Sequence, residues 1–405
     1  MWIAHQFGRR SPYGCGTTPE GGRRPPSVAV PRYRGTVEST PTVEIEQRGE
    51  IGILTLQRPR ALNALDLEMV EVLAAALERW ERDDSIRAVV LRGGGDRGFC
   101  AGGDVRGLYE TLIGDHPEQV EAFFRAEYAL NARIAEYRHP IVAFADGITM
   151  GGGIGLAGHA SHRIVTERSM LAMPETRIGF TPDVGGSWLL GRAPGRVGEY
   201  LALTGNTVGP ADAIAVGLAD HHVPSVRLEG LLSALEDRVD LDSAIQAVAT
   251  DPAPGTLTGE LEWIDVAFAQ PTVAQIVDAL RGRPEDAARE TAGHLGTLPP
   301  TALAVTLEAV RRARKLPDLR ATLAQEYGLV LWFGTTQPDL VEGIRAQLVD
   351  KDRSPRWNPA PGQELPADLL DQAYGFTPPT PRSVRPSSRQ ETTSPLARVE
   401  VVDPA

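Results

Sequence analysis

The sequence predicts an α/β fold with a mainly helical C-terminal region, and three observations support this prediction. Strand-like and helix-like segments alternate along the first half of the chain, which is the pattern of α/β proteins. Glycine-rich loops follow two of the predicted strands, where the chain turns from a strand into a helix. From about residue 228 onward the strand signal fades and helical periodicity replaces it. The 405 residues correspond to roughly two or three average domains.

The folded part of the chain is expected to begin with a β-hairpin. Short apolar segments at residues 43–45 and 51–56 flank Gly49, which is a hairpin signal. A helix should follow, with Asn63 and Asp66 as candidate N-caps. Its apolar residues recur at helical spacing, at Val70, Leu73, Leu77 and Trp80.

The next segments continue the alternation. Residues 88–91 form a β-branched strand, and a loop rich in glycine occupies residues 93–98. The following elements are a helix at 118–137, a strand at 141–145, a second glycine-rich turn with a short helix, and a strand at 164–166. Apolar spacing predicts three later helices around residues 303–310, 323–331 and 340–348.

Both ends of the chain have the composition of disordered segments. Residues 1–40 contain glycine-rich and proline-rich pieces, six arginines and two acids, without helical or strand periodicity. This composition also suits a transit peptide, but no amphipathic face is visible, so we expect a disordered extension. Residues 376–405 are expected to form a disordered tail rich in Pro, Ser and Thr. Between these segments we place a catalytic core at residues 41–227 and a mainly helical region at 228–375.

Composition excludes several classes of protein. The net charge of −12 argues against nucleic acid as the main partner, because phosphate binding needs a basic face. No apolar stretch reaches the ~20 residues of a transmembrane helix, so no membrane partner is expected. The two cysteines, Cys15 and Cys100, are too few for a disulfide framework and suit a reducing compartment. We therefore expect a cytoplasmic protein.

Two glycine-rich loops carry the first candidate chemistry. They are Phe99-Cys-Ala-Gly-Gly-Asp104 and Gly147-Ile-Thr-Met-Gly-Gly-Gly-Ile-Gly155. The second contains a G-x-G-x-x-G match, but the next strand begins by Ile164, which leaves too short a helix for a dinucleotide site. Backbone N–H groups from both loops could instead converge on one oxygen as an oxyanion hole. Close packing of the backbone explains the same glycines equally well.

Two acidic residues form the second candidate. Glu175 and Asp183 lie eight residues apart among apolar side chains, which should raise the pKa of each carboxyl and prepare it for acid–base or nucleophilic work. Either acid could instead be a helix cap, and Asp183 stands directly before Val-Gly-Gly, where a helix could start. The two roles are not separated at this point.

Other reactive residue types are poorly placed. His159-x-x-His162 has no acidic or thiol companions, so we expect no metal site. Gly185-Gly-Ser-Trp-Leu189 lacks the final glycine of a serine-nucleophile elbow. Cys100 stands in an apolar run without a nearby histidine and is interpreted as a small buried side chain.

Seven motifs in order make the chain resemble a known superfamily. They are Phe99-Cys-Ala-Gly-Gly-Asp104, Phe123-Phe-Arg-Ala-Glu-Tyr128, Gly147-Ile-Thr-Met-Gly-Gly-Gly153, Met173-Pro-Glu-Thr176, Pro182-Asp-Val-Gly-Gly186, Leu201-Ala-Leu-Thr-Gly205 and Asp350-Lys-Asp-Arg-Ser-Pro-Arg-Trp357. With the strands before them they span about residues 43–357. The chain resembles the crotonase (enoyl-CoA hydratase/isomerase) superfamily, and within it the 3-hydroxyisobutyryl-CoA hydrolases.

The resemblance implies a crotonase-like fold of repeated ββα units for residues 41–227 and an acyl-CoA substrate. It assigns the oxyanion hole to the backbone N–H groups of Gly103 and Gly152, and the two functional carboxylates to Glu175 and Asp183. It further implies that Glu127, Arg58, Ala61, Leu62, Ala101 and Asp104 contact the substrate. Arg58 and Arg60 lie in the loop that would hold the nucleotide end of CoA.

One departure separates the chain from the hydratases. Hydratases carry a second glutamate just after the triple glycine, and the matching position here is Gly155. We therefore expect a thioester hydrolase of valine catabolism that acts on 3-hydroxyisobutyryl-CoA and needs no cofactor beyond the CoA of its substrate. An enoyl-CoA hydratase or isomerase and a non-catalytic acyl-CoA-binding protein stay open as alternatives. The resemblance also makes a homo-oligomer an open expectation.

Overall fold

The computed structural model describes residues 41–114 and 116–377. They belong to a compact unit that begins at Pro41, whereas residues 1–40 and 378–405 lie outside the described residues. The disorder expected for residues 1–40 and for the tail at 376–405 therefore stays a prediction. Of that tail the structure describes only residues 376 and 377. No helix within the described ranges combines the length and apolar character that a membrane span requires.

A six-stranded sheet is the frame of the unit. Its strand order is β1-β2-β3-β5-β7-β9, and every neighbouring pair is parallel except the β1–β2 hairpin. The strands are β1 (Val43–Arg48), β2 (Ile51–Leu56), β3 (Ala88–Gly93), β5 (Ile141–Ala145), β7 (His162–Val165) and β9 (His221–His222). The predicted hairpin is confirmed, with Arg48 paired to Ile51 and Gly49 in the left-handed conformation of the turn.

A second, parallel sheet of three short strands carries the glycine loops. It has the order β4-β6-β8, formed by β4 (Gly98–Cys100), β6 (Ile148–Met150) and β8 (Met170–Ala172). Each of these strands follows a strand of the large sheet within a few residues, so β3–β4, β5–β6 and β7–β8 are successive units of the chain. Because all three short strands are parallel, their carboxyl ends lie at one edge, and this edge is where a site is expected.

The core helices follow these strand pairs. They are α1 (Leu67–Glu81), α2 (Val105–Ile113), α3 (Pro117–Ala135), α4 (Gly152–Ala157), α5 (Gly186–Gly191), α6 (Val197–Thr204) and α7 (Pro210–Ala215). In α1 the four apolar residues predicted from helical spacing are all buried, and the Asp66 side chain caps the helix by accepting from the N–H of Met69 at 2.9 Å. Asn63 is not a cap, because its amide donates to the carbonyls of Gly98 and Phe99 and ties its loop to β4.

The described residues beyond 227 are mainly helical, as predicted. The helices are α8 (Leu228–Glu236), α9 (Leu241–Val248), α10 (Leu261–Phe268), α11 (Val273–Arg281), α12 (Asp286–Leu295), α13 (Pro300–Ala313), α14 (Leu319–Thr336), α15 (Pro338–Ile344) and α16 (Leu369–Tyr374). The helix expected at 340–348 is divided, because residues 345–349 form a π-helical turn after α15.

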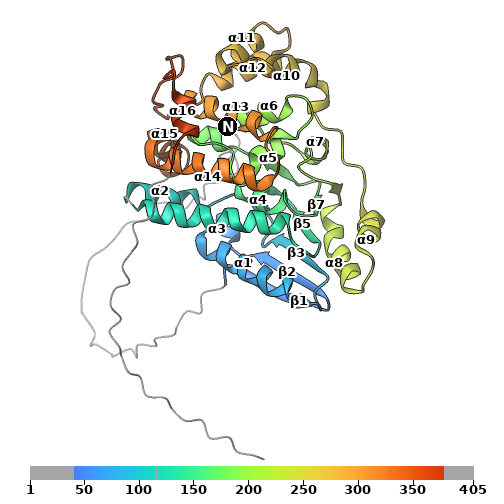
Figure 1. Cartoon of the computed structure of the whole chain (residues 1–405). Helices are drawn as coiled ribbons and strands as arrows, with labels where there is room; N and C mark the ends of the chain where they lie inside the picture. Colours follow the sequence, from blue (N-terminus) through green and yellow to red (C-terminus); the bar gives the residue numbers. More distant parts are fainter. Residues whose placement is uncertain (1–40, 115, 378–405) are drawn as a thin grey trace, which may run out of the picture. The chain divides into compact units, whose positions relative to one another are not determined.

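The two faces of the large sheet are covered by different helices. Ile51 and Ile53 point to the face that packs against leucines of α8 and α9, whereas Leu54 and Leu56 point to the opposite face and the main core. This alternation is the period of two expected for a strand. Helix α14 runs alongside α3 across the core (Figure 1), so the helical region covers the helix that carries Glu127.

Candidate active site

The two glycine loops meet at the carboxyl ends of β4 and β6. The N–H of Leu65 donates to the carbonyl of Gly102 at 2.8 Å, and the N–H of Asp104 donates to the carbonyl of Leu65 at 2.7 Å. In this parallel bridge the N–H of Gly103 therefore points away from Leu65. Gly152 is the first residue of α4, so its N–H has no acceptor within the helix. Neither N–H donates to a backbone group of the described residues.

The backbones of these two loops lie close together. A Cβ atom at Gly152 would lie 3.3 Å from the nitrogen of Gly103, and a Cβ atom at Gly102 would lie 3.6 Å from the nitrogen of Gly152. Gly102 and Gly151 also have positive φ angles of 112° and 49°. The two candidate donors are thus neighbours, which is the arrangement that an oxyanion hole needs.

Two buried carboxyl groups face the glycine loops. Glu175 opens the short turn Glu175–Ile178 after β8, and its Oε1 lies 2.9 Å from the position of a Cβ on Gly151. Glu127 comes from α3, and its Oε1 lies 2.7 Å from the position of a Cβ on Gly152. Within the described residues, Glu175 Oε2 and Glu127 Oε1 are buried and lack hydrogen-bond partners. Such orphaned oxygens suit a site that binds a polar substrate or water.

Asp183 lies in a strained turn beside these carboxyl groups. It is 6% exposed, and the next residue, Val184, has a φ of 51°. A β-branched residue in the left-handed region is a strained conformation, of the kind that gathers at functional sites. The ring Nε2–H of His159 donates to the carbonyl of Val184 at 2.8 Å and holds the turn from one side.

Burial and mutual repulsion shift the pKa values of these groups upward. Burial raises the pKa of Glu175 and of Glu127 well above the ordinary value, and the nearby Asp183 adds to both shifts. Burial, followed by the charge of Glu326, raises the pKa of Asp183 to about 8. The Tyr128 hydroxyl partly offsets that rise, although its geometry falls short of a full hydrogen bond. Within the described ranges none of the three acids has a basic ion-pair partner, so no cation offsets the rise of their pKa values, and each carboxyl holds its proton to a higher pH than an exposed one does.

Helix capping does not explain these acids. The N-cap of α5 is Gly185, and the N-cap of the Glu175–Ile178 turn is Pro174; neither helix start receives a side-chain cap from Asp183 or Glu175. The acceptor for the start of α5 is Glu326 instead, which takes the N–H of Gly185 at 2.6 Å.

The remaining residues that the resemblance assigned to the substrate lie in the loops beside Gly103. Asp104 caps α2 by accepting from the N–H of Gly107 at 3.1 Å, and the N–H of Ala101 donates to the carbonyl of Leu62 at 3.0 Å. Ala61 is exposed on the neighbouring short turn. The structure brings these residues together, and their contact with substrate stays a prediction.

Arg58 has a structural role in the same loop. Its guanidinium forms ion pairs with Asp104 at 2.9 Å and Asp66 at 3.1 Å, and it donates to the carbonyl of Ala64 at 2.6 Å. These contacts tie the loop to the start of α2. Arg60 is exposed. Its guanidinium is therefore more accessible than that of Arg58 to the phosphates that CoA would bring.

Three site residues were missed by the sequence reasoning. Glu326 on α14 is fully buried and contacts the Asp183 turn. Tyr128 and Asn131 lie on α3 with Glu127, and their buried polar atoms lack partners among the described residues. The only available signal for Glu326 was an acid within the apolar face of a predicted helix, next to Leu323 and Val330.

The structure explains why position 155 is glycine. A Cβ atom there would lie 2.7 Å from the Cβ of Val184 and 2.9 Å from the Nδ2 of Asn131. The strained turn after Asp183 fills the space, so a glutamate side chain does not fit at this position.

Cys100, His159 and His162, which the sequence analysis also considered, make contacts typical of structural residues. Cys100 is fully buried, and burial raises the pKa of its thiol to about 12, which makes it a poor nucleophile. His162 contacts Ser161 and Asp242, whereas His159 contacts Val184, so the two histidines do not converge. A cavity of about 570 Å³ borders His159 and Trp188, but none of the predicted site residues lines it.

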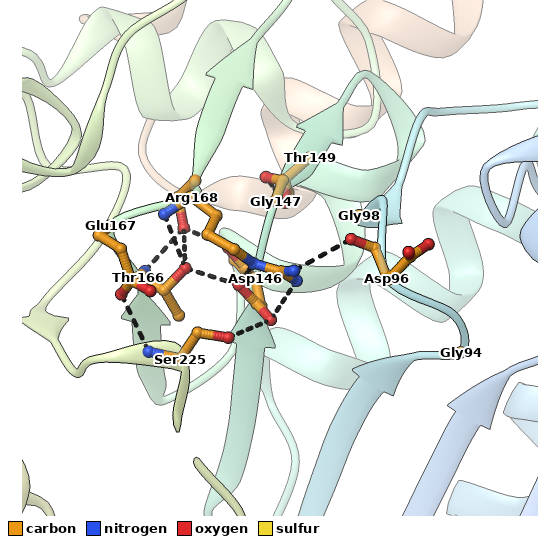
Figure 2. Close-up of polar contacts among 12 residues, drawn as sticks. Gly94, Asp96, Gly98, Asp146, Gly147, Thr149, Thr166, Glu167, Arg168 and Ser225 are labelled. Atoms are coloured by element: carbon orange, nitrogen blue, oxygen red, sulfur yellow. Dashed lines mark hydrogen bonds and ion pairs between the residues drawn. The ribbon is translucent and has the colours of Figure 1, made fainter. Parts of the chain in front are cut away.

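A polar junction ties together the segments that lead into the glycine loops. Asp146, directly after β5, accepts from the hydroxyls of Thr166 at 2.6 Å and Ser225 at 2.9 Å, and from two nitrogens of Arg168 at 2.9 and 2.6 Å. Figure 2 shows that Arg168 also reaches the carbonyl of Asp96, at 3.0 Å. The junction therefore links the residues just before β4 to those just before β6, and so supports the spacing of the two strands that end at Gly103 and Gly152.

Comparison with known proteins agrees with this geometry. A family model described as enoyl-CoA hydratase/isomerase matches residues 51–374. A protein named 3-hydroxyisobutyryl-CoA hydrolase, mitochondrial, from Danio rerio is 37% identical over 343 residues, which cover 82% of this chain and 89% of that protein. The protein of the same name from Rattus norvegicus is 38% identical over 350 residues, with coverages of 83% and 89%.

A solved structure is also similar. The crystal structure described as a carnitinyl-CoA dehydratase from Mycobacterium thermoresistibile matches with a TM-score of 0.80 and 45% identity, and the match covers 84% of this chain and 98% of that one. The crotonase-like fold expected from the sequence is thereby confirmed.

Proposed function

The chain belongs to the enoyl-CoA hydratase/isomerase family, and we propose that within it the protein is a thioester hydrolase that cleaves 3-hydroxyisobutyryl-CoA in valine catabolism. The observation that carries this proposal is the combination of acids at the glycine loops. Glu175 and Asp183 are present, and Val184 fills the space that a hydratase would need at Gly155. The names of the curated relatives support the same reaction.

In the proposed reaction the carbonyl oxygen of the thioester accepts from the N–H groups of Gly103 and Gly152. The charge that develops on this oxygen is then stabilised by donors that are already in place. Glu175 attacks the carbonyl carbon, the C–S bond breaks, and CoA leaves with the electron pair and takes up a proton. Water then cleaves the mixed anhydride to release the acid and restore Glu175. In the other route Glu175 removes a proton from a water that attacks the same carbon directly.

Asp183 orients the 3-hydroxyl of the substrate or the water and handles its proton. Its pKa of about 8 makes the protonated form abundant at neutral pH, so the carboxyl can donate a hydrogen bond. Glu127 lies at Gly152 and contacts the substrate near its reacting carbonyl. No cofactor or metal is required by this scheme, because CoA is part of the substrate; we expect EDTA to leave the rate unchanged.

A substrate panel tests the proposal. The purified protein is offered 3-hydroxyisobutyryl-CoA, 3-hydroxypropionyl-CoA, crotonyl-CoA and a carnitinyl-CoA, and release of free thiol is followed beside the enoyl absorbance. We expect thiol release from the 3-hydroxyacyl esters alone. A change in enoyl absorbance without thiol release would contradict the hydrolase and support the alternative.

Single turnover in ¹⁸O water tests the covalent route for Glu175. After one turnover, an anhydride hydrolysed by attack at the enzyme carbonyl leaves ¹⁸O in the Glu175 carboxyl, which mass spectrometry of the peptide detects. Label found only in the released acid means that water attacked the acyl carbon of the substrate, either in the thioester or in the anhydride.

The alternative is an enoyl-CoA hydratase, dehydratase or isomerase on the same fold. The similarity to the structure described as a carnitinyl-CoA dehydratase favours it. The packing at Gly155 opposes a two-glutamate hydratase, whereas an isomerase needs one acid only. A non-catalytic acyl-CoA-binding protein is a further candidate, which any turnover in the panel excludes.

We propose a cytoplasmic location and a homo-oligomeric state as further parts of this hypothesis. The small number of cysteines supports a reducing compartment, which the mitochondrial matrix also provides, and the vertebrate relatives are named mitochondrial. Cell fractionation tests the location, and light scattering of the purified protein tests the oligomeric state.

A further inference from the structure

Glu326 holds the turn that carries Asp183 from the side of the helical region. It lies on α14 and is fully buried. Its Oε2 accepts from the N–H of Gly185 at 2.6 Å, and its Oε1 accepts from the N–H of Ser187 at 2.9 Å and from the Ser187 hydroxyl. One carboxylate thus receives three donors from Gly185 and Ser187, which lie one and three residues after Val184.

The turn needs such support because its backbone is strained. Val184 has a φ of 51° and Gly185 a φ of 79°. For the β-branched Val184 this region is strained, and the surrounding structure must offset the strain. His159 holds the carbonyl of Val184 on one side, and Glu326 holds the N–H groups of Gly185 and Ser187 on the other. Asp183 is therefore fixed by contacts that lie outside its own side chain.

Glu326 also faces the reacting acids electrostatically. Burial raises the pKa of Glu326 to about 7, while its three donors favour the ionised form. Its charge is the largest cause after burial of the raised pKa of Asp183, and it also raises that of Glu175. The other titratable groups around it are Tyr128 from α3 and Tyr374 from α16.

We propose that Glu326 is a positioning residue of the thioester hydrolase: its carboxylate fixes the Asp183-Val184-Gly185 turn and supplies the negative charge that faces Asp183. This inference rests on the proposed function for its kinetic consequences. It gives α14, which follows the crotonase-like core by about a hundred residues along the chain, a direct part in preparing the site.

Glu326→Gln is the main test. The amide keeps the size of the side chain but removes the charge, and its NH₂ end would face a backbone N–H donor. We expect kcat to fall about 10- to 100-fold with KM within about 3-fold, because the substrate itself does not touch this residue. We also expect the limb of the pH–rate profile that reports Asp183 to move to lower pH by about one unit, because a facing negative charge is lost.

Two further variants separate positioning from stability. Glu326→Asp keeps the charge and should restore the position of the pH limb, with kcat between the wild type and Glu326→Gln. Ser187→Ala removes one of the three donors and leaves the carboxylate in place, so it should lower kcat only a few-fold. This milder variant keeps the test valid if Glu326→Gln does not fold.

Asp212→Asn is a matched control. Asp212 is also buried, at 6% exposure, and accepts from the N–H groups of Thr256 and Leu257 at 3.0 and 3.2 Å and from the Thr256 hydroxyl at 3.4 Å. It holds a loop with the same number of donors but is not among the groups that shift the acids of the site. We expect Asp212→Asn to lower Tm and to leave both kcat and the pH profile unchanged. If Glu326→Gln behaves in the same way, the proposal is overturned.

A measurement without turnover keeps the inference separate from the proposed reaction. The infrared band of neutral carboxyl groups is recorded across pH for the wild type, Asp183→Asn and Glu326→Gln. The part of the band lost in Asp183→Asn reports Asp183, and we expect it to disappear at lower pH in Glu326→Gln. An unchanged titration would overturn the inference even if the protein hydrolyses the ester, and a shifted one would support it even if the substrate class is wrong.

Discussion

Two groups of acidic side chains lie at the ends of parallel strands, and they differ in how they are partnered. The carboxylate of Asp146 receives donors from Thr166, Arg168 and Ser225. Glu175, by contrast, has a buried oxygen without a partner among the described residues. Fully satisfied polar groups stabilise a fold, whereas unsatisfied ones cost stability and are kept where they bind or react. The difference favours a structural role for the Asp146 junction and supports the proposed chemical role of the acids at the glycine loops.

The variant Glu175→Gln tests this difference with the largest expected effect. We expect kcat to fall by about 10³-fold or more, because the group that attacks or activates water is lost. The free energy of unfolding should not decrease, since a buried carboxyl without a partner is replaced by a neutral amide. Thiol release, CoA binding and Tm are measured together.

Glu167→Gln serves as the control at the junction. Glu167 is exposed and accepts from the N–H of Ser225 at 2.9 Å. This variant should keep wild-type kcat. Wild-type kcat in Glu175→Gln as well would remove Glu175 from the reaction.

Gly152→Ala tests the donors themselves. The added Cβ would lie 2.7 Å from Glu127 Oε1 and would push the carboxyl and the loop apart. We expect a loss of about 10²-fold in kcat, which is typical when one oxyanion donor is displaced. Gly230→Ala is the control, because open space surrounds this glycine on α8. Equal kcat values in the two variants would argue against the oxyanion hole.

Asp146→Asn tests the other side of the comparison. It removes the ion pair with Arg168, whose guanidinium also reaches the carbonyl of Asp96. We expect the free energy of unfolding to fall by about 1–3 kcal/mol, with kcat lowered less than tenfold. Urea unfolding beside the thiol assay measures both. A large loss of kcat at unchanged stability would place this junction in the chemistry instead.

The pH dependence of the free energy of unfolding also distinguishes the acids of the site from partnered acids. The pKa values of Asp183 and Glu326 rise from 3.8 and 4.5 to about 8 and about 7 on folding. The folded state thus binds more protons than the unfolded chain between about pH 4 and pH 8. The free energy of unfolding should therefore fall as the pH rises through this window, by at most about 1.4 kcal/mol per pH unit for each such group. Asp183→Asn should flatten the slope, which unfolding curves at several pH values can show.

Much of the fold was predictable because local patterns agree with the tertiary structure. The apolar spacing of Val70, Leu73, Leu77 and Trp80 gave the buried face of α1. Helix α2 was not predicted, although Val105, Leu108 and Leu112 recur at helical spacing, and the structure buries its residues only in part. Asn63 has the residue type of a cap, but tertiary contacts to Gly98 and Phe99 compete for its amide.

The residues of the candidate site could be selected from the sequence. Residue types and spacing indicated two glycine loops and two acids among apolar residues, and the resemblance to the crotonase superfamily assigned Gly103 and Gly152 to an oxyanion hole and Glu175 and Asp183 to the functional carboxylates.

How these residues lie relative to one another, and which groups shift their pKa values, follows only from the tertiary structure. The parallel strands β4, β6 and β8 bring their carboxyl ends to one edge, which sets the glycine N–H groups beside Glu175. The contact of Glu326 with Gly185 spans 141 positions of sequence, and no local pattern encodes it. Such contacts depend on how α14 packs over the core, because burial and electrostatics act through space and not along the chain.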